Sequence, residues 1–72
     1  MHSEQWVIYD HPKDFPEHFV VRRWTIRLHY AIPTQSYNLA TSLEDARKFI
    51  PAGLVRTLPT PDDDPVIMEV WI

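Results

Sequence analysis

The residues with the clearest chemical capability lie in one segment near the N-terminus. Carboxylate and imidazole groups together can bind a divalent metal ion, and four of them lie within nine residues: Asp10, His11, Asp14 and His18. One hypothesis is therefore a small metal-dependent enzyme that uses this loop. The segment has no HExxH or H-x-H spacing and contains two prolines, so ordinary loop histidines are the favoured interpretation.

A second acidic group lies near the C-terminus, where the run Asp62-Asp63-Asp64 is bounded by prolines. Dense carboxylates can supply the oxygen ligands that Ca²⁺ or Mg²⁺ prefers. An EF-hand loop needs a central glycine and a closing glutamate, and this loop has neither. We predict a solvated turn here, and we expect no metal and no other cofactor.

Cations gather in one strand-like segment: Arg22, Arg23, Arg27 and His29. Such a group could bind nucleic acid or another anion on a sheet surface. Two observations oppose this reading. Trp24 and Tyr30 have the opposite strand phase, and the net charge of −3 lacks the basic excess of most nucleic-acid binders. The same arginines could instead pair with Glu69 or with Asp10 and Asp14, or contact a protein partner.

Other kinds of catalysis have little support. The chain has no cysteine, which excludes disulfides, thiolate catalysis and Cys-ligated zinc. No serine lies in a Gly-x-Ser-x-Gly motif, and a single glycine cannot form a glycine-rich phosphate loop. A chain of 72 residues can scarcely enclose a deep pocket without a partner. We therefore expect a protein without catalytic activity.

Length and composition point to one small globular domain over residues 1–72. The hydrophobic fraction of 44% is too high for a disordered tail. No apolar run approaches the 18 residues of a membrane-spanning helix, and no signal peptide is recognisable. The expected compartment is the cytoplasm, with no membrane partner.

The elements that must position these groups are mostly strands. Hydrophobic alternation and turn residues predict strands over 5–9, 19–32, 37–40, 54–58 and 66–72, and a helix from 42 to 49 or 50. The long strand ends at Pro33. The helix begins with a capping box from Thr41 to Glu44 and ends at Pro51. The last strand is either central in the sheet or paired across a subunit interface.

The fold class that follows is α+β. We expect a small antiparallel sheet of three to five strands with one short helix packed on one face, in the order β-β-(β)-α-(β)-β. Within the long strand, Phe19 and Val21 are out of phase with Trp24. We predict a β-bulge at or near Arg22 and Arg23 that returns them to one face. The alternative is an unbroken strand whose two ends use opposite faces.

The chain is rich in aromatic residues, with nine Phe, Trp and Tyr among 72. One short helix cannot cover both faces of a sheet that carries so many. The remaining apolar surface is expected to bind a partner or a second copy, because exposed aromatic and arginine residues are favoured at interfaces. The hypothetical interface consists of Trp6, Arg23, Arg27, His29, Ile67 and Trp71.

Several segments together carry a resemblance: W-V-I-Y-D-H-P-K-D-F-P over 6–16, F-V-V-R over 19–22, S-L-E-D-A-R over 42–47, I-P-A-G-L over 50–54 and D-D-P-V-I-M-E-V-W over 63–71. This pattern resembles a group of small bacterial proteins that have no assigned activity. The resemblance implies a bacterial, cytoplasmic, single-domain protein, and it transfers no site residues.

The leading hypothesis is a small non-catalytic protein-interaction module that forms a homodimer or binds another protein. The first alternative is a nucleic-acid or anion-binding module that uses the four cations of the 22–29 segment. The weaker alternative is the metal-dependent enzyme.

Overall fold

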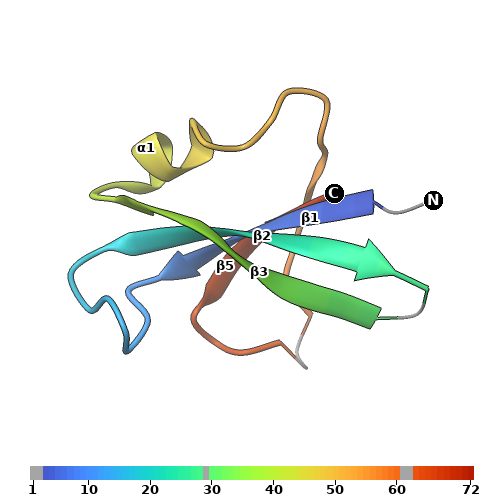
Figure 1. The fold of residues 1–72 in the computed structure, drawn as a ribbon. Helices are drawn as coiled ribbons and strands as arrows, with labels where there is room; N and C mark the ends of the chain where they lie inside the picture. Colours follow the sequence, from blue (N-terminus) through green and yellow to red (C-terminus); the bar gives the residue numbers. More distant parts are fainter. Residues whose placement is uncertain (1–2, 29, 61–62) are drawn as a thin grey trace.

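The computed structural model describes residues 3–28, 30–60 and 63–72. The chain forms one antiparallel sheet with a short helix over one face (Figure 1), and the strands follow the order β3-β2-β1-β5-β4. The elements are β1 (Ser3–Asp10), β2 (Phe19–Arg27), β3 (Tyr30–Ala40), α1 (Leu43–Arg47), β4 (Arg56–Thr57) and β5 (Ile67–Trp71). The predicted small antiparallel sheet with one short helix is therefore confirmed in outline. The fold is mostly sheet, because the helix has only five residues.

The predicted strand over 19–32 is wrong, because the chain reverses inside it. Arg27 pairs with Tyr30, so β2 and β3 form a tight hairpin, and Leu28 in the connection has a φ of 53°. A turn of this kind usually contains Gly or Asn, and the absence of both concealed it. Pro33 does not end a strand but lies within β3. An edge strand tolerates proline, since its outer N–H groups have no ladder partner.

The pairing of β1 with β2 defines two faces of the sheet. Its register is unbroken from Ser3 and Ile26 to Asp10 and Phe19. Successive side chains alternate, so the helix face carries Trp6, Ile8, Phe19, Val21, Arg23, Thr25, Arg27, Glu69 and Trp71. The opposite face, which we call the loop face, carries Val7, Tyr9, Val20, Arg22, Trp24 and Val70. Phe19 and Trp24 therefore lie on opposite faces.

The predicted bulge occurs at the expected place but in the neighbouring strand. The irregularity lies between Arg22 and Trp24, where the three residues 34–36 of β3 face Arg23 alone, so the two additional residues belong to β3. Thr34 Oγ1 donates a hydrogen bond to the carbonyl oxygen of Arg23 at 2.7 Å, which holds this segment against β2. An insertion of two residues keeps the period of two, so the bulge leaves the phase of both strands intact. The alternative of an unbroken β2 with apolar residues on both faces is the one observed.

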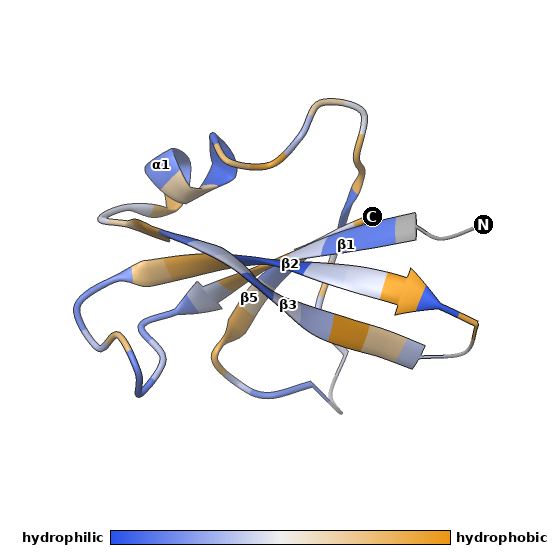
Figure 2. Cartoon of the chain, in the orientation of Figure 1, coloured by the Kyte–Doolittle hydropathy of each residue, from blue (hydrophilic) through white to orange (hydrophobic). Residues whose placement is uncertain are grey.

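The core lies between α1 and the helix face. Ile8, Val21, Ala40 and Ala46 are buried there, and Trp6, Phe19, Leu43, Ile50 and Trp71 pack around them. On the loop face, Val7, Val20 and Val70 are also buried although no helix covers them. They lie beside two other parts of the chain, which line cavities with them: Pro12, Asp14 and Phe15 in one, and Thr57, Leu58, Thr60 and Asp63 in the other. Figure 2 shows that apolar residues continue beyond the covered region to the hairpin ends of β2 and β3.

The helix begins one residue later than predicted. Ser42 is the N-cap, and its Oγ accepts a hydrogen bond from the Asp45 N–H at 3.1 Å. The predicted box from Thr41 to Glu44 is therefore wrong by one position. Beyond α1, the N–H groups of residues 48–50 each bond to the carbonyl three residues earlier. The helical path thus tightens into 3₁₀-type turns before Pro51.

The last strand, β5, is interior, between β1 and β4, which was one of the two predicted options. Its register shifts beside Ile8 and Tyr9, so that Glu69 pairs with Ile8 and Ile67 with Tyr9. Met68 is the additional residue. The shift places Ile67 on the loop face, so its predicted phase with Glu69 and Trp71 is wrong.

Candidate interaction surface

Three of the six predicted interface residues form a row across the helix face. Trp71 pairs with Trp6 and Trp6 pairs with Arg23, which joins β5, β1 and β2 side by side. Arg27 lies farther along β2 on the same face. Ile67 is on the loop face and does not belong to this row, and His29 lies outside the described residues.

The tryptophans themselves supply little of the exposed surface, because all three are half-buried. Trp71 Nε1 donates to Glu69 Oε1 at 3.0 Å, and Trp24 Nε1 donates to the Tyr9 hydroxyl at 3.1 Å. Trp6 Nε1 is buried without a protein partner. Trp6 and Trp71 pack against the core. The predicted surplus of exposed aromatic surface must therefore lie elsewhere in the sheet.

That surface lies on β3, which is an edge strand of the sheet and has β2 as its neighbour among the described strands. Its 11 residues are mostly exposed. Four are large and apolar, with exposed fractions of 60% for Tyr30, 42% for Ile32, 43% for Tyr37 and 39% for Leu39. The opposite edge, β4, has two residues. A long free edge carries unpaired backbone groups and readily accepts another strand. Sequence reasoning missed this edge because strand order cannot be read from periodicity.

The exposed apolar residues of β3 lie on opposite faces of the sheet before and after the bulge, because they are even-numbered before it and odd-numbered after it. In the first half, Tyr30 pairs with Arg27 and Ile32 with Thr25, so both lie on the helix face. In the second half, Tyr37 pairs with Arg22 and Leu39 with Val20. Those two side chains therefore lie on the loop face. The predicted opposition of phase between Tyr30 and Arg27 is wrong, since the hairpin turn reverses the chain between them.

The arginines of β2 have separate environments. Arg22 lies over the ring of Tyr37, with its guanidinium carbon 5.5 Å from the ring centre, and Tyr37 also contacts Phe15 at 5.4 Å between ring centres. Arg23 Nη1 is 3.7 Å from Glu4 Oε2, which is a weak, exposed pair. Arg27 is exposed at the hairpin end. Within the described residues, none of the predicted pairs of these arginines with Glu69, Asp10 or Asp14 forms.

Glu69 instead joins three elements on the helix face. Its buried carboxylate accepts hydrogen bonds from Arg47 of α1, Arg56 of β4 and the neighbouring Trp71. The hydrogen bonds from Arg47, above all, lower the pKa of Glu69 below its ordinary value of 4.5 against the opposing effect of burial. This cluster fixes α1 and β4 to β5. An acidic residue inside an apolar strand was the sequence signal for it.

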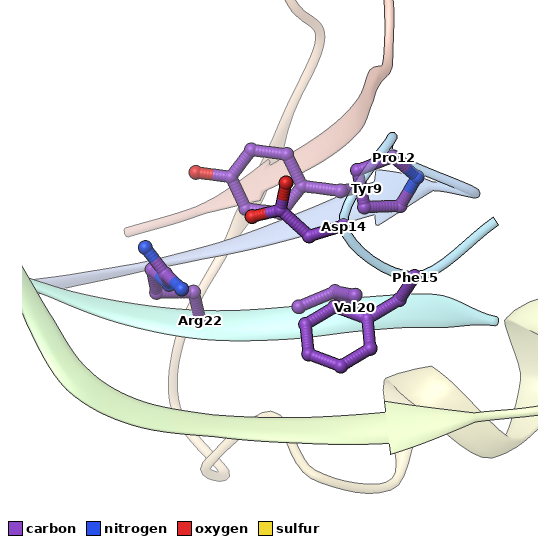
Figure 3. Close-up of a pocket in the computed structure, with 6 residues that line it drawn as sticks. All are labelled: Tyr9, Pro12, Asp14, Phe15, Val20 and Arg22. Atoms are coloured by element: carbon purple, nitrogen blue, oxygen red, sulfur yellow. The ribbon is translucent and has the colours of Figure 1, made fainter.

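The predicted metal-binding loop does not converge on one point. His11 hydrogen-bonds to Asp10 and packs against the ring of Phe19. Asp14 instead lines a cavity of about 110 Å³ on the loop face with Tyr9, Pro12, Phe15, Val20 and Arg22. Figure 3 shows that Tyr9 and Arg22 enter it from β1 and β2, whereas Asp14 and Phe15 come from the segment between these strands. His18 lines a different groove, beside Leu39.

The described part of the second acidic run, Asp63 and Asp64, forms a turn. Asp63 accepts a hydrogen bond from the Thr60 N–H, and Asp64 accepts one from the Val66 N–H. Asp62 lies outside the described residues. Over the described parts of the chain, no three His, Asp or Glu side chains lie close enough together to hold a metal ion.

The burial of Tyr9 raises the pKa of its hydroxyl above 10.0, although the hydrogen bond from Trp24 acts in the opposite direction. This hydroxyl therefore serves as a neutral acceptor that holds Trp24 in place. It belongs to the packing of the loop face.

Within residues 3–28, 30–60 and 63–72, no helix is long and apolar enough to cross a membrane. Comparisons of the chain with protein-family models, with curated proteins and with solved structures found no match. The resemblance to small bacterial proteins therefore stays a prediction.

Proposed function

We propose that this protein is a small, non-catalytic interaction module that binds a second polypeptide chain, in the first instance a second copy of itself. The observation that carries this proposal is the free edge strand β3 with its four exposed apolar side chains. Backbone groups along such an edge supply hydrogen bonds to an added strand, and the apolar side chains supply buried area.

The total surface of the chain supports self-association. A folded monomer of 8.6 kDa exposes about 4,700 Å² by the usual scaling with mass. This chain exposes 5284 Å², which is roughly 600 Å² more than that scaling gives. Two copies together therefore carry an excess of about 1,200 Å², the lower limit of specific protein interfaces. We expect a dimer of modest affinity.

Sedimentation velocity over a wide concentration range tests the proposal. A double variant, Ile32→Lys with Leu39→Lys, places a charge on each half of β3, and charged residues on an edge oppose strand pairing. The matched control is Val55→Lys with Leu58→Lys, which adds the same charge at exposed apolar positions outside β3. We expect the wild type and the control to dimerise and the β3 variant to stay monomeric. A wild type that is monomeric at millimolar concentration contradicts the proposal.

A second candidate function is the binding of nucleic acid or another anion by the cations of the 22–29 segment. One observation favours it: Tyr30 lies beside Arg27 on the helix face, where it could stack on a base. The net charge of −3 and the pairing of Arg23 with Glu4 oppose it. A fluorescence titration with short single-stranded oligonucleotides at low salt distinguishes the two functions. Binding that weakens with salt and is lost in Arg27→Gln would favour this candidate.

A further inference from the structure

We infer that the second copy pairs in antiparallel orientation with the second half of β3, residues 36–40, across a twofold axis at Asn38. This inference rests on the proposed self-association, and it adds the strand segment, the register and the residues that meet. It follows from the irregularity of β3, from the contacts of Tyr37 and from the symmetry of the sequence around Asn38.

The irregularity of β3 allows one regular partner strand to follow only one half. The side chains of Tyr30 and Ile32 lie on the helix face, whereas those of Tyr37 and Leu39 lie on the loop face. A regular antiparallel partner places its side chains on the same side as the residues it opposes. The two additional residues at 34–36 interrupt the register of such a partner, so it can pair regularly with β3 before these residues or after them, but not both.

The first half of β3 is the poorer template. Pro33 has no N–H to donate to an added strand. This half also ends at the hairpin turn, where Leu28 has a positive φ and is 85% exposed. The side chains of Tyr30 and Ile32 have no aromatic or cation–π neighbour in the described part of the chain. Fixing these side chains against a partner would lose more conformational entropy than fixing a side chain that is already held.

The second half is already positioned by its contacts. The ring of Tyr37 lies against Phe15 and beneath the guanidinium of Arg22. Ala40 is buried in the core, and α1 follows directly, with Ser42 capping it. The strand between residues 36 and 40 is therefore anchored at both ends, and its outer edge is preorganised to accept a partner.

The sequence of this half is complementary to itself. In an antiparallel pair with its twofold axis at Asn38, Tyr37 lies opposite the partner's Leu39, and Leu39 lies opposite the partner's Tyr37. Each is an aromatic–aliphatic cross-strand pair on the loop face, and such pairs stabilise sheets. Residues 36–40 contain no charge, so no like charges meet along the junction. The five facing rows supply roughly four to six backbone hydrogen bonds, since alternate rows exchange two each.

Single-cysteine crosslinking tests this register, and the natural chain has no cysteine to interfere. Opposed residues in antiparallel strands have Cα atoms about 4.5 to 5.5 Å apart, which a disulfide can span. Asn38→Cys places the thiol on the proposed axis. Ala31→Cys places it where the axis would lie if the first half paired. Val55→Cys is exposed and lies beside β4 at the opposite edge of the sheet, so it reports chance collision.

We expect Asn38→Cys to form a covalent dimer under mild oxidation at least ten times faster than either other variant. Faster crosslinking of Ala31→Cys overturns the inference and leaves the proposed self-association intact. Equal rates for the three variants also overturn it. In that case the sedimentation of the wild type decides whether self-association itself stands.

A second measurement does not depend on whether Asn38→Cys folds. Leu39→Lys and Ile32→Lys add the same charge to equally exposed apolar positions on the two halves of β3. We expect Leu39→Lys to raise the dimer dissociation constant at least tenfold and Ile32→Lys to leave it within twofold of the wild type. The reverse order overturns the inference.

Discussion

The cluster around Glu69 allows a quantitative test of how the sheet holds its helix. Glu69→Gln keeps the size of the side chain and one acceptor for Trp71 Nε1, but it removes the charge that two arginines contact. A hydrogen bond to a charged group stabilises a fold by about 1.5 to 3 kcal/mol. The side chains of Arg47 and Arg56 are 43% and 50% exposed. In the variant, water therefore replaces part of their lost interaction with the carboxylate. We expect the free energy of unfolding to fall by about 2 kcal/mol.

This change is large for so small a domain. At about 4 to 8 °C per kcal/mol, it lowers the melting temperature by roughly 10 °C. The three tryptophans give a fluorescence signal for urea and thermal unfolding, and Trp71 lies within the cluster. Glu4→Gln is the matched control, because Glu4 is exposed and forms only a weak pair with Arg23, in which Oε2 and Nη1 are 3.7 Å apart. We expect it to cost less than about 0.5 kcal/mol.

The pH dependence supplies an independent check. Because the pKa of Glu69 is lower in the folded state than its ordinary 4.5, its ionised form favours folding. This stabilisation is complete above pH 4.5 and is lost as the pH falls through the lowered folded-state pKa. The difference in stability between wild type and Glu69→Gln should therefore narrow as the pH falls below 4.5. The assigned role of Glu69 is wrong if Glu69→Gln and Glu4→Gln lower the free energy of unfolding equally at neutral pH. It is also wrong if the difference in stability between the wild type and Glu69→Gln does not change with pH.

Three further changes test the local structure. Ser42→Ala removes the N-cap acceptor of the Asp45 N–H and should cost about 1 kcal/mol in urea unfolding, whereas Thr41→Ala should be nearly neutral; equal costs would contradict the assigned cap. Gly53→Ala should also cost about 1 kcal/mol, because φ is +93° although a Cβ would meet no atom; an unchanged stability would refute this strain. Leu28→Asn should raise stability by about 0.5 to 1 kcal/mol, since Asn tolerates a positive φ better than Leu. A loss of stability in thermal melts would show that the exposed leucine has a packing role.

Much of the sheet could be predicted because local patterns determine it. Apolar and β-branched residues around Trp6 and along the last strand predicted β1 and β5, and Pro51 set a limit to the helical segment. The hairpin at Leu28 could not be predicted in this way. Its residues lack the usual turn chemistry. The alternation of apolar and polar residues also continues through the turn in the sequence, although Ile26 and Tyr30 lie on opposite faces of the sheet.

The candidate surface was predicted only in part, for a different reason. An excess of aromatic residues can be counted in the sequence, and the row of Trp6, Trp71 and Arg23 indeed comes together. Which apolar residues stay exposed depends on strand order, and strand order is a property of the whole sheet. Tyr37 and Leu39 became interface candidates only when β3 was found at the edge.

Amide hydrogen exchange at low and high protein concentration tests the central claim most directly. If two copies join along β3, peptides that cover residues 34–41 should exchange more slowly at millimolar than at low micromolar concentration, while those covering 54–58 at the other edge stay unchanged. Exchange along β3 that is the same at both concentrations would contradict the account.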